Sequence, residues 1–207
     1  SMHAKNQEAF TAAFAHELKT PLTSIIGYAE LLRTMDLSQE EKWQAADYIF
    51  SQGKRLESLS YKLLDLFVLQ QQELTFAPVS SSELTDAIVP MMKQTLAAKD
   101  VLLSMHLAPA TLYGDKDLLL SLLINLIDNA RKASSSGDTI TVLGYSDNDY
   151  YCISVQDTGK GIPADEIDKI TKPFYMVDKS RSRKEGGAGL GMSLCYEILR
   201  LHHAQWH

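Results

Sequence analysis

The first third of the chain carries apolar residues at helical spacing. Residues 6–74 contain a single proline. Apolar side chains recur there at steps of three or four residues, which places them on one face of a helix. They are Phe10, Phe14, Leu18, Leu22, Ile25, Ala29 and Leu32. Residues 35–38 break the pattern, and Ser38 followed by Glu40 and Glu41 favours the start of a second helix.

The second helix shows a coiled-coil-like seam. Ile49, Leu56 and Leu63 repeat every seven residues, and Leu59 and Leu66 are offset by three. Two such helices bury too little apolar surface by themselves, so a second copy of the hairpin is expected to complete a four-helix bundle. The pattern therefore predicts a homodimer. A monomeric hairpin packed on the rest of the chain is the alternative.

After a linker expected at residues 76–80, strands and helices mix. Helices are predicted at 81–98, 115–133 and 189–201, and strands at 101–107, 139–144 and 150–156, the last two joined by a polar turn at 146–149. This order predicts one helical layer over one sheet. The predicted fold class is α+β, a long helical hairpin (residues 1–75) followed by an α/β sandwich (residues 81–207).

Composition narrows the function classes. The chain has 207 residues, 45% of them hydrophobic, and a net charge of -6, which argues against a nucleic-acid-binding protein. No apolar run approaches the roughly 20 residues of a membrane span, and no secretory signal is expected. Cys152 and Cys195 lack metal or disulfide spacing, which suits a reducing compartment.

His16 is the first candidate for chemistry. It lies about 200° around the helix from Phe14 and from Leu18, so it faces away from the apolar stripe. Its own face is mostly small or polar and carries Ala12, Lys19, Thr20 and Thr23. A neutral imidazole nitrogen can attack a phosphoryl group, and the adjacent Glu17 can hold the proton of the other ring nitrogen. Pro21 is expected to kink the helix here. Taken alone, His16 also fits a solvated surface histidine.

A polar stripe on the helix at 115–133 is the second candidate. Asn125, Asn129 and Lys132 share one face, opposite Leu119, Leu122, Leu126 and Ala130. Amide oxygens suit Mg²⁺ and a lysine supplies charge for phosphate, although a solvated face fits equally well. Asp128 is interpreted as a structural partner of Lys132.

Two glycine-containing segments complete the candidates. Residues 157–163 follow an apolar strand, and their two glycines allow a flat ligand to approach while Asp157 accepts a hydrogen bond from an amine. An ordinary turn is one alternative. Asp-Thr-Gly also occurs in aspartic proteases, but the second carboxylate motif that such a protease needs does not appear in the sequence. Residues 186–191 open a helix and offer N–H groups to phosphate. They lack the Gly-Lys-Ser/Thr of a Walker A loop and the preceding strand of a dinucleotide fingerprint.

Residues 14–22, Phe-Ala-His-Glu-Leu-Lys-Thr-Pro-Leu, resemble the phosphoacceptor motif of the main class of sensor histidine kinases. The resemblance implies that His16 accepts the phosphoryl group and that Glu17 assists as acid or base. It also implies that Thr20 positions a water when the same protein dephosphorylates its partner.

The nucleotide segments resemble the boxes of the same family. Residues 125–130 resemble the asparagine box, 157–163 the adenine-reading motif of gyrase-type ATPases, 172–175 the phenylalanine box and 186–191 the second glycine box. The resemblance implies roles for Asn125 and Asn129 with Mg²⁺ and phosphate, Lys132 with phosphate and Asp157 with the adenine amine. It implies an ATP-binding role for Gly159, Gly161, Phe174, Tyr175, Gly187, Gly189, Leu190 and Gly191. Residues 175–187 are expected to form a lid, with Lys179, Arg181, Arg183 and Lys184 near the phosphates.

The family resemblance implies a kinase core that uses Mg-ATP to phosphorylate His16. The core is then expected to pass the phosphoryl group to an aspartate of a response regulator, and also to dephosphorylate that regulator. Its expected partners are a second copy, a receiver domain and an upstream sensor domain. It is expected to be a cytoplasmic part of a membrane-anchored bacterial protein. The family normally continues past residues 201–203 with a β-hairpin, so we expect either that the sequence is cut short there or that the domain lacks these two strands. Because His16 and the ATP site lie in different domains, the linker near Pro78 is expected to let them meet.

Two alternatives remain open. A conformational-switch ATPase of the gyrase or MutL type needs no histidine motif, but it needs an early glutamate in the asparagine-box helix, where this chain has Asp117 and no glutamate. A degenerate dimerisation module is expected to lose Asn129, Asp157 or a glycine of the second box, and all are present.

Overall fold

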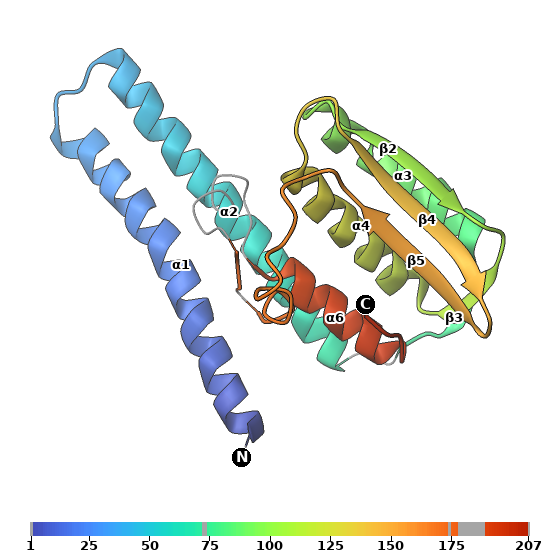
Figure 1. The fold of residues 1–207 in the computed structure, drawn as a ribbon. Helices are drawn as coiled ribbons and strands as arrows, with labels where there is room; N and C mark the ends of the chain where they lie inside the picture. The colour runs from blue at the N-terminus through green and yellow to red at the C-terminus, as the bar shows by residue number, and fades with distance from the viewer. Residues whose placement is uncertain (1, 72–73, 174, 178–188, 207) are drawn as a thin grey trace. The chain divides into compact units, whose positions relative to one another are not determined.

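Two helices of 33 residues form the first part of the molecule, α1 (Met2–Thr34) and α2 (Gln39–Gln71) (Figure 1). The computed structural model describes residues 2–71, 74–173, 175–177 and 189–206. It has two units, residues 1–67 with 172–190 and residues 68–171 with 191–207, and each is described by itself. The helix boundaries agree with the hairpin predicted from periodicity.

The start of α2 is set by a capping box. The Ser38 N–H donates to Glu41 Oε2 over 2.8 Å, and the Glu41 N–H donates to Ser38 Oγ over 3.3 Å. Hydrogen bonds from Ser38 lower the pKa of Glu41. These bonds satisfy backbone groups that the first turn leaves unpaired, which confirms Ser38 as the helix start.

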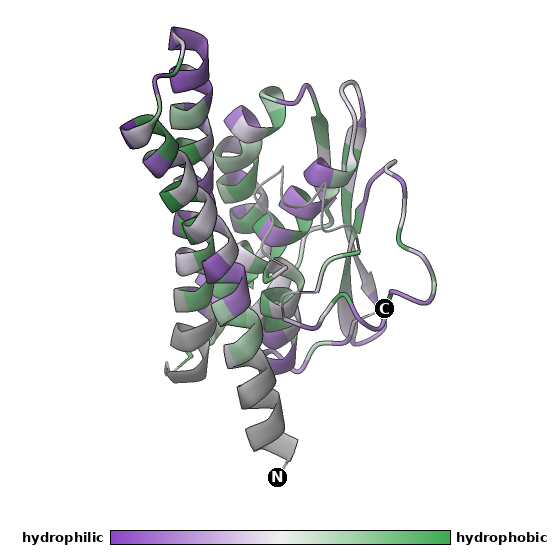
Figure 2. Cartoon of the chain, turned by 90° about the vertical axis from the view of Figure 1, so that its left-hand side faces the viewer, coloured by the Kyte–Doolittle hydropathy of each residue, from purple (hydrophilic) through white to green (hydrophobic). Residues whose placement is uncertain are grey.

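The hairpin buries its predicted apolar stripe only in part. Polar and apolar stretches alternate along both helices (Figure 2). In the single chain Leu22 is 44% exposed, whereas Pro21 is buried within a helix that continues through it. Leu59 of the predicted seam is buried, and the Tyr28 and Tyr48 rings pack with centroids 4.5 Å apart. The seven-residue repeat therefore located the inward side of α2 better than the three- and four-residue steps located the inward side of α1.

The second unit is an α/β sandwich. Its elements are β1 (Ala77–Ser80), α3 (Ser81–Ala97), β2 (Leu102–Leu107), β3 (Thr111–Gly114), α4 (Lys116–Ala133), β4 (Thr139–Asp147), β5 (Tyr150–Gln156) and α6 (Gly191–Leu201). Strands β2, β4 and β5 form one sheet, parallel between β2 and β4 and antiparallel between β4 and β5. Helices α3 and α4 lie on one face of it (Figure 1). Leu84, Ile88, Leu123, Ile127, Ile140 and Val142 are the most buried apolar residues between these layers.

The predicted linker at residues 76–80 is wrong for its last four residues. Ala77–Ser80 is strand β1, which pairs antiparallel with β3, and Pro78 lies opposite Tyr113. Ser80 then caps α3 through a capping box. A proline in a sheet is tolerated at an edge, and four residues are too few to show alternation. Pro78 is therefore not the hinge between the two units.

The residues just before β1 are also held on the second unit. The Thr75 N–H donates to Asp115 Oδ2 over 3.1 Å, and the Phe76 ring lies 5.0 Å from the His202 ring, centroid to centroid. Asp115 at the same time caps α4 by accepting from the N–H groups of Asp117 and Leu118. Asp115 therefore links the residues just before β1 to α4, the helix that carries the candidate nucleotide-binding side chains.

Candidate functional site

His16 lies exposed on α1, as the sequence predicts. Its side chain is 71% exposed, and its Nδ1 is 4.0 Å from Oε1 of the buried Glu17. Glu17 Oε2 accepts a hydrogen bond of 2.8 Å from Arg55 Nη2 on α2. Thr20 Oγ1 donates to the His16 carbonyl over 3.3 Å, which places this hydroxyl one turn along the helix from the imidazole. The structure therefore brings the three predicted residues of this site together.

The predicted asparagine pair lies beside Gly191, the last residue of the predicted glycine box, between α4 and α6. Asn125 Nδ2 donates to the Ser121 carbonyl over 2.8 Å, and Asn129 Nδ2 lies 3.0 Å from the sulfur of Met192. A Cβ built on Gly191 would lie 3.3 Å from Asn125 Oδ1 and 3.7 Å from Asn129 Oδ1. Asn125 Oδ1 and the side-chain amide of Asn129 thus lie beside the N-terminus of α6, where backbone N–H groups favour anions.

Asp128 is the structural partner of Lys132, as predicted. Its carboxylate pairs with Lys132 Nζ at 2.7 Å and with Arg131 Nη2 at 2.9 Å. Burial on its own would raise the pKa of Asp128, but the two cations outweigh it and the pKa lies below the ordinary value of 3.8. Because the Lys132 ammonium is engaged here, contact with a phosphate requires this ion pair to rearrange.

The lowered pKa of Asp128 predicts a pH-dependent contribution to stability. A carboxyl whose folded-state pKa is depressed stabilises the fold above its ordinary value of 3.8, and this is lost as the pH falls through the lower folded-state value. We expect Asp128→Asn to reduce the free energy of unfolding by about 1 kcal/mol at pH 7. The difference from wild type should shrink below pH 4. Urea unfolding across pH measures it, with Asp149→Asn in an exposed turn as the control; a loss independent of pH contradicts the assignment.

The Asp157 loop approaches the end of α4 closely. Asp157 Oδ1 accepts the Gly159 N–H over 2.8 Å. A Cβ on Gly159 would lie 2.7 Å from the Ala133 carbonyl oxygen, so only glycine fits there. Gly161 has φ of +71°, which also favours glycine. The second unit therefore places the adenine motif, the asparagine pair and Gly191 along one helix, α4.

The remaining predicted residues fall into two groups. Tyr175, Gly189 and Leu190 are described, and Gly189 has φ of +69°. Phe174, Gly187 and the predicted basic lid residues Lys179, Arg181, Arg183 and Lys184 lie outside the described residues. Their proposed contacts with ATP remain predictions.

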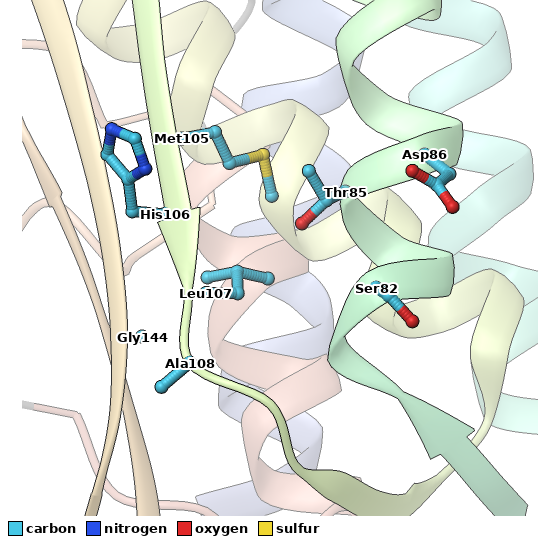
Figure 3. Close-up of a pocket in the computed structure, with 8 residues that line it drawn as sticks. All are labelled: Ser82, Thr85, Asp86, Met105, His106, Leu107, Ala108 and Gly144. Carbon is cyan, nitrogen blue, oxygen red and sulfur yellow. The ribbon is translucent and has the colours of Figure 1, made fainter.

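A separate pocket of about 530 Å³ lies between α3 and β2 (Figure 3). Its lining includes Ser82, Thr85 and Asp86 of α3 and Met105, His106 and Leu107 around β2. Figure 3 shows Met105 and Leu107 pointing toward α3, with His106 on the other side of the strand. None of these residues was predicted as a site residue, and none lies on α4 or α6.

Among the residues that the structure describes, no group of three or more His, Cys, Asp or Glu side chains is arranged to hold a metal ion. No helix within the described ranges is both long and apolar enough to cross a membrane.

Comparison with known families matches both parts of the chain. Residues 6–72 match the His Kinase A (phospho-acceptor) domain, and residues 114–207 match the family described as histidine kinase-, DNA gyrase B-, and HSP90-like ATPase. The chain belongs to the sensor histidine kinases. It carries both domains of the catalytic core of a protein-histidine kinase, which confirms the resemblance and favours neither alternative.

Curated relatives of this kinase core support the assignment. Phosphate regulon sensor protein PhoR of Pseudomonas aeruginosa is 34% identical over 203 residues, which cover 95% of this chain and 45% of that protein. Hybrid signal transduction histidine kinase K of Dictyostelium discoideum is 34% identical over 212 residues, 94% of this chain and 17% of that protein. The chain thus spans less than half the length of these relatives.

Solved structures share the fold of the kinase core. Histidine kinase ThkA, in complex with response regulator protein TrrA, has a TM-score of 0.79 at 21% identity, over 98% of this chain and 57% of that chain. Full-length ShkA in complex with AMPPNP has a TM-score of 0.62 at 25% identity, over 93% of this chain and 40% of that chain. The predicted fold class, a helical hairpin followed by an α/β domain, is confirmed.

Sequence reasoning missed the partner of Glu17. Arg55 is 38 residues away on the other helix, and both side chains are buried. A seven-residue apolar repeat gives no sign of a buried arginine inside it. The one available signal was the pair's opposite charges on two helices expected to pack together.

Proposed function

We propose that this core transfers the γ-phosphoryl group of Mg-ATP to His16 and then to an aspartate of a response regulator, which it also dephosphorylates. The observation that carries the proposal is the exposed His16 beside the buried Glu17, on a helix of the phosphoacceptor family. The ATPase-family domain of the same chain supplies the donor site.

At the acceptor, Glu17 is the group that holds the proton on His16 Nδ1, which leaves Nε2 to act as the nucleophile. The exposed imidazole lets a second macromolecule reach it, and Thr20 lies one turn away for the water of the phosphatase reaction. The roles of these three residues follow from their chemistry and their motif.

At the donor, Asn125 and Asn129 fit a Mg²⁺ ion bound with phosphates because both offer amide oxygens, which are hard ligands. The space in front of them is kept open by Gly191, where a side chain would begin 3.3 Å from Asn125 Oδ1. The ion would neutralise phosphate charge. Asp157 orients the adenine, and Lys132 supplies positive charge to the phosphates.

The partners proposed for the core follow from its surfaces and family. Leu22, Ile26 and Phe50 of the hairpin are 44%, 63% and 65% exposed in the single chain, as expected where a second hairpin completes a bundle. A receiver domain and an upstream sensor domain are the other proposed partners. The proposed setting is the cytoplasmic side of a membrane-anchored protein.

Phosphotransfer tests the proposal as a whole. The core is labelled with γ-³²P-ATP and Mg²⁺, freed of nucleotide and mixed with a panel of purified receiver domains. We expect label to leave the core and appear on at least one receiver within seconds to minutes, and not on its acceptor Asp→Asn variant. ATP hydrolysis with no label on the protein contradicts the proposal and supports a switch ATPase.

A further inference from the structure

A buried ion pair crosses the hairpin beside the phosphoacceptor. Arg55 Nη2 donates to Glu17 Oε2 over 2.8 Å, and the two side chains are only 7% and 9% exposed. Desolvating two charges costs about as much as their attraction returns, so such a pair contributes little net stability. Stability alone therefore does not account for an arginine in the interior of the helical seam.

The two oxygens of the Glu17 carboxylate face different residues. Oε2 is bound by Arg55, and Oε1 is the oxygen that lies 4.0 Å from His16 Nδ1. That distance is longer than a hydrogen bond. The His16 imidazole is 71% exposed and can rotate to shorten the distance to Oε1. The Glu17 carboxylate, in contrast, is fixed by a charge-assisted hydrogen bond from Arg55 on α2.

We propose that Arg55 is a positioning residue of the phosphoacceptor site, acting through Glu17 on the tautomer and orientation of His16. This inference rests on the proposed function. In the transfer, His16 Nε2 forms a bond to the γ-phosphorus while the bond to the bridging oxygen breaks, and that electron pair leaves with ADP. The positive charge that develops on the ring faces Glu17 Oε1, which holds or accepts the Nδ1 proton.

The chemistry of arginine suits this task. Its guanidinium stays charged at any working pH and offers several N–H donors in a fixed plane. A carboxylate held in this way cannot swing toward solvent, so Oε1 is presented to the ring in every turnover. Without Arg55, the bond that fixes Oε2 is lost, and a carboxylate that turns no longer presents Oε1 to His16 Nδ1–H.

The test compares Arg55→Met and Arg55→Lys with Arg33→Met, an exposed arginine of α1, as the matched control. We expect Arg55→Met to lower the maximal rate of His16 phosphorylation by about 30-fold, a part of the roughly 10²–10⁴-fold that positioned acid–base groups supply. The KM for ATP should stay within about twofold because the nucleotide binds to the other unit. Arg55→Lys should recover at least about a tenth of the wild-type rate, since it keeps the charge.

A double-variant cycle separates positioning from loss of structure. In a Glu17→Gln background, we expect Arg55→Met to cost no more than about threefold further, because both residues act on one step. Additive losses, or an unchanged rate in Arg55→Met, overturn the proposal. If circular dichroism shows that Arg55→Met does not fold, Arg55→Gln, which is too short to reach Glu17, takes its place in the cycle. A wild-type core that takes up no acid-labile phosphate instead refutes the proposed function itself.

Discussion

His16→Gln should abolish phosphorylation of the core while leaving ATP binding unchanged. Glutamine keeps a polar side chain on the exposed face of α1 but offers no ring nitrogen with a lone pair for the γ-phosphorus. The side chain is 71% exposed, so the exchange should cost little stability. Labelling with γ-³²P-ATP, followed by gels run without acid, measures the loss, which we expect to exceed about 10³-fold.

The control for this variant is His106→Gln, which changes an exposed histidine of the second unit. We expect it to label like wild type. Nucleotide binding by His16→Gln, followed by fluorescence of an ATP analogue, should match wild type because the acceptor and donor lie in different units. Residual acid-labile label on His16→Gln would place the acceptor elsewhere.

Asn129→Asp should lower the phosphorylation rate by at least about 100-fold, the size of effect seen when one preorganised electrostatic contact is removed. The change is isosteric, but it places a negative charge beside Asn125 and the N-terminus of α6, where phosphates are proposed to bind. Asn129 lies against Met192 and close to the position of Gly191, so a carboxylate there faces the same space.

Asn148→Asp makes the same chemical change in the exposed turn between β4 and β5, where φ of +53° is tolerated by aspartate. We expect its phosphorylation rate to stay within about twofold of wild type, as for most surface substitutions. If Asn129→Asp phosphorylates His16 at the wild-type rate, the asparagine pair is not part of the donor site.

Local patterns in the sequence predicted most of the second unit. The Asp128 and Lys132 pair follows from i,i+4 spacing on a helix and is present at 2.7 Å. The polar turn predicted between β4 and β5 is shorter than expected, because Ser146 and Asp147 extend β4 and leave two residues to reverse the chain. Exposed strand ends carry polar residues, so composition alone does not mark where pairing stops.

Features that depend on distant partners were missed. Strands β1 and β3 have four residues each and form a sheet only by pairing with each other. In the sequence they are separated by α3 (Ser81–Ala97) and β2, so neither strand shows its partner locally. The buried Glu17 depends on Arg55, 38 residues away, and the anchoring of Phe76 depends on His202 at the other end of the chain. Periodicity reports which face of an element is apolar, but not which charged group on another element makes a buried polar position possible.

Direct mapping of the phosphate tests the central claim. Wild-type core is incubated with γ-³²P-ATP and Mg²⁺, digested at alkaline pH and analysed by tandem mass spectrometry. We predict phosphate on a ring nitrogen of His16, stable in alkali and lost in acid. Phosphate on a serine, threonine or other histidine, or ATP turnover with an unlabelled protein, would contradict the account.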